Sequence, residues 1–377
     1  MTMKYWSIFL FVMCLFILSA CRDDSIEEAS SIIPVTDAEL TIGDKIYAVV
    51  GDTLKIYFNS IVLNSASGDY GLALKCDKGN NYSKYWRYIP KTDDVGESFM
   101  DLQLFDFKGN VLVEKQVLLI TREARNPEFR RNLLCLGNSL MAAGQTPIEL
   151  SRRLKGTSGL IDSPESLSLT NYSLVGRVQN SEQTVGWEGT PGWTWQKYID
   201  SFDIQSYVDQ YCEGQMDYIY LQLGINELLW LEPFADQSFI INGAKTLIDR
   251  IHKSYPSCKV LLGSVLLPSQ NGGLGNKYPA NIVSGIYGEK GFNLKVHRLN
   301  KAYNDLANSA DYASFTYFID NNAQFDCLNV YPKIERPSGN YVPGNETIDT
   351  DGIHPANIGY WQIAAGIFRA LIGIEEA

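Results

Sequence analysis

The sequence predicts a chain of two parts, an all-β region followed by an α/β domain with a parallel sheet. Residues 37–122 hold short β-like runs, broken by turn sequences such as "SGD" and "DKGNN" at the intervals of a β-sandwich. Residues 131–377 instead alternate apolar strand candidates with helical segments. Such alternation is typical of a three-layer α/β fold, so we expect a β-sandwich domain and then a three-layer domain.

In the second part, the strands are expected at residues 132–136, 167–175, 217–223, 259–266 and 314–319. Helices are expected at residues 147–155, 194–210, 236–255, 294–309 and 357–372. The third helix shows amphipathic spacing in Ile240, Leu247 and Ile251. Because function gathers at the carboxyl ends of parallel strands, we looked for chemistry in the loops that follow them.

The first twenty residues predict a signal peptide rather than part of the fold. Lys4 precedes an apolar run that is short for a membrane span, which needs about 20 apolar residues, and that ends in small residues. Its end, "LSAC", resembles the lipobox of bacterial lipoproteins, which implies that Cys21 becomes the lipidated first residue. An ordinary signal peptide followed by a chance cysteine is the alternative.

The segment after Cys21, residues 22–36, is polar and acidic and is expected to be a tether from the membrane anchor. "CRDD" resembles the export signal of surface lipoproteins in Bacteroides-like bacteria. We therefore expect an exported lipoprotein, in the periplasm or on the cell surface at the outer membrane, that meets the membrane only through its lipid.

Composition excludes several function classes. The formal net charge of −11 and the lack of a basic stripe argue against a nucleic-acid partner. No P-loop, GxGxxG, HExxH or paired CxxC pattern is present, so neither a cofactor nor a metal is expected. Five cysteines remain after Cys14 and Cys21, an odd number that cannot pair completely, and Cys135 and Cys258 are expected to be buried thiols.

Two polar blocks follow the first strands. "GNSL" places Ser139 on a tight turn directly after the first strand, where its hydroxyl would be exposed, although a serine after glycine is more often a turn or cap residue. "VGWEGTPGWTW" follows the second strand, and its Gly192 could bring a backbone amide close to a ligand or could simply form a turn.

Two more blocks lie downstream. "GINE" places Asn226 just past the third strand, where its amide could hold an oxyanion or serve a turn. "DGIH" places Asp351 three residues before His354, a spacing that sets both side chains on one side of a helical turn. The carboxylate could then bond one imidazole nitrogen and leave the other as a base.

These four blocks, GNSL, GWT, GINE and DGIH, resemble in order and spacing those of the SGNH (GDSL-type) hydrolase superfamily. The resemblance covers residues 132 to about 373 and implies a flavodoxin-like three-layer α/β/α domain. With the region before it and the lipobox, the chain looks like an exported two-domain member of the Bacteroides type.

The resemblance implies Ser139 as nucleophile, His354 as general base and Asp351 as the residue that orients it. The oxyanion hole would consist of the amides of Ser139 and Gly192 and the side chain of Asn226. The reaction would be acyl transfer to water through an acyl-enzyme, with no metal.

The chain departs from the family pattern at two positions. The usual GDSL aspartate is Asn138, and the aspartate of the usual GxND block is Glu227. Neither position is a core catalytic group in the family, so activity is still expected, with rate and substrate in doubt.

For the substrate, the aromatic faces near the blocks could stack on sugars or bury acyl chains, and plain core packing is the alternative for each. The candidates are Trp187, Trp193, Trp195 and Trp230. Residues 266–292, after the fourth strand, are expected to form a long Gly- and Asn-rich loop without regular structure, and loops of this length are often functional. A polar lid of this kind suits a carbohydrate better than a fatty acyl chain. An acylated glycan, most simply an acetylated one, is therefore the first choice. A lipid or thioester acylhydrolase and an inactive surface glycan-binding lipoprotein are the alternatives.

Overall fold

The computed structural model describes residues 38–63, 70–106, 108–160, 167–278, 288–338 and 343–375. The predicted signal peptide, Cys21 and the tether at 22–36 lie outside these residues. These described residues form one compact unit. Among the residues that are described, no helix combines the length and the apolar character needed to cross a membrane.

The first region, up to residue 122, is built of strands and two single-turn 3-10 helices in its described part. Its strands are β1 (Glu39–Leu40), β2 (Lys45–Val49), β3 (Leu54–Tyr57), β4 (Val62–Leu63), β5 (Gly71–Lys75), β6 (Asn80–Asn81), β7 (Tyr85–Tyr88), β8 (Gly96–Phe105) and β9 (Val111–Arg122). They form sheets in the orders β2-β9-β8-β5, β3-β7-β6 and β1-β4. A buried apolar cluster that includes Ile56, Trp86, Leu102 and Leu119 holds strands of the two larger sheets together.

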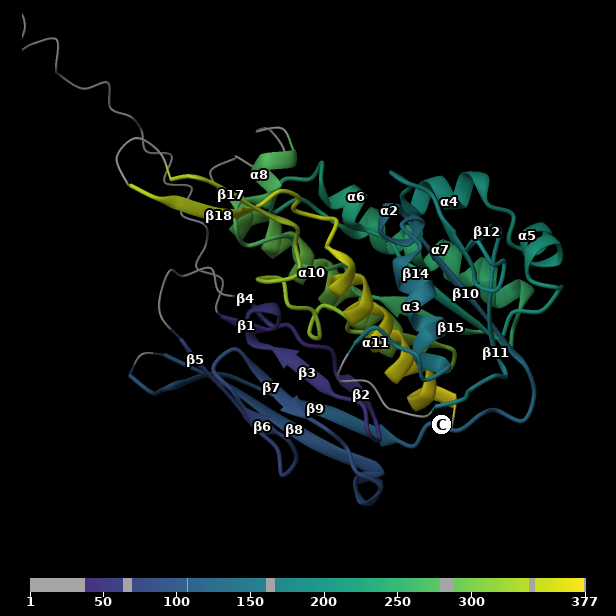
Figure 1. Ribbon diagram of the computed structural model, residues 1–377, viewed down its shortest axis with the longest axis horizontal. Coiled ribbons are helices and arrows are strands. Elements are labelled where there is room, and N and C mark those ends of the chain that lie inside the picture. Colours follow the sequence, from purple (N-terminus) through teal and green to yellow (C-terminus); the bar gives the residue numbers. More distant parts are fainter. Residues whose placement is uncertain are drawn as a thin grey trace, which may run out of the picture. The chain divides into compact units, whose positions relative to one another are not determined.

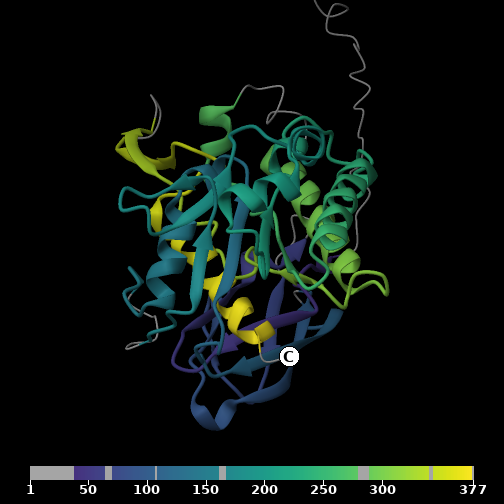
Figure 2. The ribbon, with the colours of Figure 1, turned by 90° about the vertical axis from the view of Figure 1, so that its right-hand side faces the viewer.

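The α/β region holds a seven-stranded sheet (Figure 1, Figure 2). Its strands are β10 (Arg131–Gly137), β11 (Tyr172–Val175), β12 (Val178–Gln179), β13 (Gly186–Gly189), β14 (Tyr218–Gln222), β15 (Lys259–Gly263) and β16 (Thr316–Ile319). The order is β12-β13-β10-β14-β15-β16, with β11 also paired to β10, and all pairs are parallel except β12 with β13. Strands β10, β14 and β15 are buried along almost their whole length, as parallel strands covered on both faces are.

The helices of this region are α2 (Ser139–Ala142), α3 (Gln145–Leu154), α4 (Trp195–Ser201), α5 (Ile204–Tyr211), α6 (Ile225–Leu228), α7 (Ser238–Ser254), α8 (Gly273–Lys277), α10 (Gly288–Asn308) and α11 (Asn357–Glu375). The amphipathic spacing expected for α7 is confirmed, since Ile240, Leu247 and Ile251 are all buried. Helix α11 is apolar nearly all round and buried, with Arg369 as its one buried cation among the described residues.

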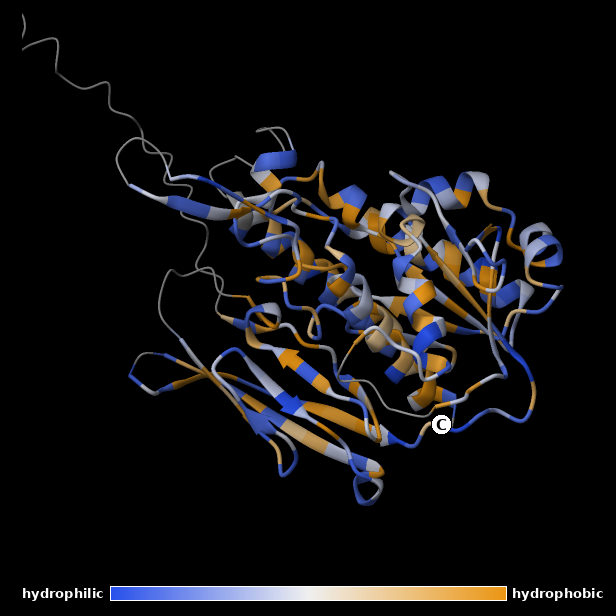
Figure 3. Ribbon diagram, viewed as in Figure 1, coloured by the Kyte–Doolittle hydropathy of each residue, from blue (hydrophilic) through white to orange (hydrophobic). Residues whose placement is uncertain are grey.

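The structure differs from the sequence prediction in four places. The expected helix at 194–210 is two helices, because Asp203 accepts a hydrogen bond from the Ser206 amide at 2.8 Å and begins α5 afresh. The expected strand at 167–175 is only β11, so the block with Gly192 follows β13 instead. The stretch at 266–292 contains α8 and the start of α10, and its residues 279–287 lie outside the described part. A hydrophilic hairpin of β17 (Lys333–Pro337) and β18 (Asn345–Asp349) was not expected (Figure 3).

Polar contacts join the first region to the α/β region within the compact unit. Thr41 Oγ1 lies 2.8 Å from His297 Nδ1, and the Gly43 amide donates to Asp320 Oδ2 at 2.7 Å. Ser60 donates to the carbonyl of Phe325 at 2.8 Å. These bonds satisfy groups that would otherwise be buried without partners.

Candidate active site

Ser139 begins α2 directly after the buried strand β10. Asn138, the residue between them, caps α2, because its Oδ1 accepts from the Leu140 amide at 3.1 Å. The carbonyl of Gly137 accepts from the Tyr198 hydroxyl at 2.6 Å, and a side chain on Gly137 would meet the Gln222 carbonyl at 2.9 Å. The turn is thus fixed from both sides, and it leaves Ser139 partly exposed at the carboxyl end of the central strand.

The loop before α11 brings His354 and Asp351 to this serine. His354 Nε2 lies 2.8 Å from Ser139 Oγ, and His354 Nδ1 lies 3.1 Å from Asp351 Oδ2. Asp351 Oδ1 also accepts from the backbone amides of Ile353 (2.9 Å) and His354 (3.0 Å), which holds the carboxylate in place. Because a carboxylate only accepts, Nδ1 carries the imidazole proton, and Nε2 is left to accept from the serine hydroxyl.

Burial by itself would raise the pKa of Asp351, but hydrogen bonds from His354 and Lys277 and from two backbone amides hold it well below its ordinary value. Asp351 is therefore ionised at neutral pH. An ionised carboxylate at this place would stabilise a positive charge on His354.

Lys277 was not foreseen from the sequence. It ends α8, and its Nζ donates to Asp351 Oδ2 at 2.7 Å, the same oxygen that faces His354. The segment that carries it packs directly on the Asp351 loop: Ser269 donates to Asp349 Oδ2 at 2.6 Å, and a Cβ on Gly273 would meet the Asp351 carbonyl at 2.4 Å. Lys277 and Asp351 lie 74 positions apart in the sequence. No local sequence pattern could therefore have predicted that Lys277 contacts the site.

The two remaining blocks lie side by side. Asn226, in the first turn of α6, donates from Nδ2 to the Trp193 carbonyl at 2.8 Å. Gly192 has a φ of +77°, a left-handed conformation that favours glycine, and it is exposed. Within the described part of the chain, the backbone amides of Ser139 and Gly192 donate to no protein acceptor. They are thus free to bind an oxygen of a ligand.

Glu227, one of the two departures from the family pattern, supports the Gly192 block. Its Oε1 accepts from the Trp195 amide at 2.7 Å, at the start of α4. Burial raises the pKa of this carboxyl, although bonds from backbone amides oppose the rise. The buried Glu227 side chain therefore connects the GINE block to the GWT block rather than reaching into the open site.

The tryptophans differ in what they can contact. Trp187 is 5% exposed within the core, so its ring has no face left for a substrate, contrary to the role predicted for it. Trp195 is also buried, and its Nε1 donates to the Tyr303 hydroxyl at 2.6 Å. Trp193 is partly buried and packs edge-on against Tyr198, while Trp230 is 73% exposed.

The other two histidines lie apart from the serine. His297 is buried, and burial lowers its pKa to about 4. His252 stacks its ring on Phe315, with 3.6 Å between the ring centroids. In the ranges given above, no three His, Cys, Asp or Glu side chains cluster as metal ligands would.

No protein-family model and no curated protein matches the chain. Several solved structures do. A family 3 carbohydrate esterase from Clostridium thermocellum is 22% identical, with 64% of this chain and 99% of that chain covered and a TM-score of 0.39. A carbohydrate esterase family 3 protein from Talaromyces cellulolyticus is 15% identical, with 65% of this chain and 98% of that chain covered and a TM-score of 0.41. A GDSL-like lipase from Bacteroides thetaiotaomicron is 15% identical, with 64% of this chain and 87% of that chain covered and a TM-score of 0.37.

Identities below 25% and TM-scores near 0.4 transfer no substrate and no residue role to this chain. What the chain can do is therefore argued from its own residues.

Proposed function

We propose that this chain is a serine esterase that hydrolyses acyl esters, with acetyl esters of carbohydrates as its substrates. One observation carries the proposal: Ser139 Oγ, His354 and Asp351 form a continuous chain of contacts of 2.8 and 3.1 Å. A hydroxyl bonded to an imidazole that is itself held by a buried carboxylate is the arrangement that activates serine as a nucleophile.

The proposed reaction has two stages. Ser139 Oγ attacks the ester carbonyl as His354 Nε2 takes its proton, and Asp351 stabilises the resulting imidazolium. The negative charge that develops on the carbonyl oxygen is held by the amides of Ser139 and Gly192 and by Asn226 Nδ2. His354 then gives the proton to the leaving alcohol, which leaves the acyl group on Ser139. Water attacks this acyl group as His354 takes a proton from the water, and His354 returns the proton to Ser139 Oγ as the acid is released.

The carbohydrate part of the proposal rests on the polar surroundings of the site. Residues 266–292 are rich in Gly and Asn, and the described part of this stretch beside Asp351 contributes mainly polar groups such as Asn271, Asn276 and Lys277. A long acyl chain would need an apolar trench instead. Trp230, with 73% of its surface exposed, is the side chain we assign to stacking on a sugar ring.

The proposal extends to the organisation of the chain. We assign residues 131–377 to a flavodoxin-like three-layer α/β/α domain, preceded by a β-sandwich domain at residues 37–122. We also propose that residues 1–20 are removed and that a lipid on Cys21 anchors an exported protein, in the periplasm or on the cell surface. Mass spectrometry of the N-terminal peptide from a bacterial membrane fraction tests the lipid on Cys21.

The activity is tested with residues 22–377 on p-nitrophenyl acetate, butyrate and octanoate, beside Ser139→Ala. We expect turnover of acetate that falls with chain length and drops by about 10⁴-fold or more in the variant. Rates that rise toward octanoate would favour the lipid acylhydrolase instead. Equal rates for the variant and the unaltered chain would remove Ser139 from the mechanism and leave the glycan-binding alternative.

The oxyanion assignment has its own variant. Asn226→Ala should lower kcat on p-nitrophenyl acetate by about 10²–10³-fold, as loss of one oxyanion donor does, with a much smaller change in KM. Asn242→Ala, the same change on the exposed face of α7, is the matched control and should leave p-nitrophenyl acetate turnover unchanged. A KM effect without a kcat effect in Asn226→Ala would assign this residue to substrate binding alone.

A further inference from the structure

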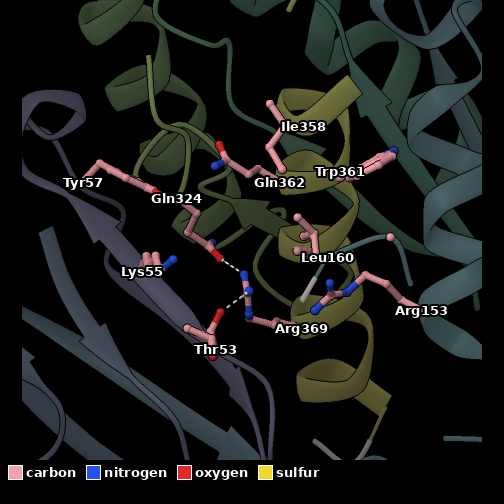
Figure 4. Close-up of a pocket in the computed structure, with 12 residues that line it drawn as sticks. Thr53, Lys55, Tyr57, Arg153, Leu160, Gln324, Ile358, Trp361, Gln362 and Arg369 are labelled. Carbon is pink, nitrogen blue, oxygen red and sulfur yellow. Dashed lines mark hydrogen bonds between the residues drawn. The ribbon is translucent and has the colours of Figure 1, made fainter. Parts of the chain in front are cut away.

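Three Lys and Arg residues are buried in the described part of the chain: Arg153, Arg369 and Lys295. The two arginines pair with Asp52, a carboxylate that is buried with them. Figure 4 shows Arg369 among its neighbours, where it also donates to the Thr53 carbonyl at 2.6 Å. Lys295, on α10, instead binds the α6 segment, which belongs to the proposed active site. Lys295 is therefore the buried cation that bears on the proposed reaction.

The ammonium of Lys295 holds the end of α6. The residue is 2% exposed, and its Nζ donates to the carbonyls of Leu228 and Leu231 at 2.7 Å each. The same Nζ lies 4.5 Å from the ring centroid of Phe292. Burial lowers the pKa of this ammonium to about 8. Burying a charged group is costly, and the bonds to the two carbonyls offset part of that cost.

The same face of α10 contacts the beginning of α6. Leu299 and Tyr303 follow Lys295 at steps of four residues, so the three side chains lie along one face of the helix. A side chain on Gly224, directly before α6, would meet the Tyr303 hydroxyl at 2.8 Å and Leu299 at 2.9 Å. The Tyr303 hydroxyl also donates to the Leu223 carbonyl at 3.4 Å. Helix α10 therefore supports α6 at both of its ends.

Helix α6 is too short to hold its own shape. It has four residues, and a single helical turn is not stable without contacts from outside. Asn226 and Glu227 connect it to the GWT block, and Lys295 connects its end to α10, a helix of 21 residues. The position of the Asn226 side chain therefore depends on these contacts.

We propose that Lys295 is a positioning residue: by holding the end of α6, it keeps Asn226 Nδ2 where this group can donate to the oxyanion. An oxyanion donor acts at about 2.7–3.1 Å from the developing charge, so a small shift of α6 would weaken the bond. Lys295 itself contacts no reacting atom. Its effect on catalysis rests on the proposed function, whereas its effect on the position of Asn226 does not.

A double-mutant cycle with p-nitrophenyl acetate tests the catalytic effect. Lys295→Met removes the ammonium and keeps an unbranched side chain. We expect it to lower kcat by about tenfold or more with little change in KM, as loss of a transition-state interaction does. In a chain that carries Asn226→Ala, the same change should lower kcat by less than about threefold, because the group that Lys295 positions is already absent. Losses that simply multiply would overturn the proposal, since Lys295 would then act independently of Asn226.

Two further variants accompany the cycle. Lys295→Gln keeps a donor on a shorter side chain, so it should lose less kcat than Lys295→Met, and it carries the same cycle if the methionine variant does not fold. Lys301→Met is the matched control, the same change on the same helix at an exposed lysine that pairs with Asp305. It should leave kcat unaltered. An equal loss in Lys301→Met would overturn the assignment to Lys295.

Crystal structures of the unaltered chain and of the Lys295 variant that folds separate this inference from the proposed function. We expect Asn226 Nδ2 in the variant to leave its place 2.8 Å from the Trp193 carbonyl, while His354 keeps its contact with Ser139. An α6 that stays in place would overturn the inference, whatever the esterase rates are. A displaced α6 in a chain whose turnover does not depend on Ser139 would support Lys295 as the residue that positions Asn226 and remove the proposed function.

Discussion

The chain holds two charge clusters that are alike in composition and opposite in setting. Around Ser139, one carboxylate, Asp351, serves His354 and Lys277, and the side chain of His354 is 32% exposed. Between β3 and α11, one carboxylate, Asp52, serves Arg153 and Arg369, and none of the three side chains is more than 6% exposed. A solvent-exposed cluster can exchange a proton with a substrate, whereas a buried cluster can only stabilise the fold.

The comparison predicts that an Asp→Asn change lowers activity at Asp351 and lowers stability at Asp52. In Asp351→Asn, an amide that donates would face His354 Nδ1, so the imidazole would adopt the wrong tautomer for accepting the Ser139 proton. We expect kcat on p-nitrophenyl acetate to fall by about 10⁴-fold. The urea midpoint of unfolding should change little, because Oδ1 can still accept from the two backbone amides.

If Asp351→Asn kept within about tenfold of the unaltered kcat, this carboxylate would not be the residue that orients His354. A large loss of stability in the same variant would make Asp351 a structural residue, like Asp52. Either result would remove the contrast between the clusters.

The next largest effect is expected in the buried cluster. Asp52→Asn leaves two buried guanidinium groups without their counter-charge, and breaking a buried ion pair in this way costs about 3–5 kcal/mol of unfolding free energy. Urea unfolding measures it. Turnover of p-nitrophenyl acetate per folded molecule should be unchanged.

The control for Asp52→Asn is Asp305→Asn. Asp305 pairs with Lys301 on an exposed helix face, with side chains 63% and 59% exposed, and such a pair contributes only about 0.5 kcal/mol. Similar losses from the two variants would mean that solvent reaches the Asp52 cluster and screens it.

A smaller effect concerns the contact between the first region and α10. The pKa of His297 lies at about 4 because the ring is buried, against about 6.5 in the unfolded chain. Between these values the unfolded chain binds the extra proton. The stability that neutral His297 contributes is therefore complete above pH 6.5 and is lost as the pH falls toward 4.

We expect the unfolding free energy to fall by about 2 kcal/mol from this group alone between pH 7 and pH 5. Urea unfolding at a series of pH values measures the slope. His297→Gln removes the titrating group, so its slope over the same range should be flatter. An identical slope in the variant would mean that other groups cause the acid sensitivity.

The smallest predicted effect concerns Lys277, the lysine beside Asp351. Lys277 donates to Asp351 Oδ2, the oxygen that also faces His354, and its side chain is 51% exposed. Because solvent screens a half-exposed pair, Lys277→Gln should lower kcat on p-nitrophenyl acetate by no more than a few-fold. Lys301→Gln, the same change at an exposed lysine elsewhere, should leave kcat unaltered. A fall of about 100-fold or more in Lys277→Gln would show that this lysine is needed to hold Asp351 in place.

The positions of the long elements followed from local patterns. Strands β10, β14 and β15 are apolar runs of the length that a buried parallel strand needs, and α7 shows its buried face in its own spacing. The shorter elements were missed for a physical reason. Strand β13 has four residues, with Gly and Trp, and β12 has only two. Strand β13 forms because β10 offers it an edge, and β12 forms because it pairs in turn with β13, so neither depends on its own local preference.

The sequence by itself determined the order of the four blocks and the chemistry that they could perform, because the functional groups of serine, histidine and aspartate are set by residue type alone. Only the tertiary structure decided which groups meet. It brought His354 to Ser139 across 215 positions, placed Lys277 on Asp351, and set Asp52 between arginines 101 and 317 residues away. Contacts over such separations depend on how the whole chain packs, and no local pattern encodes them.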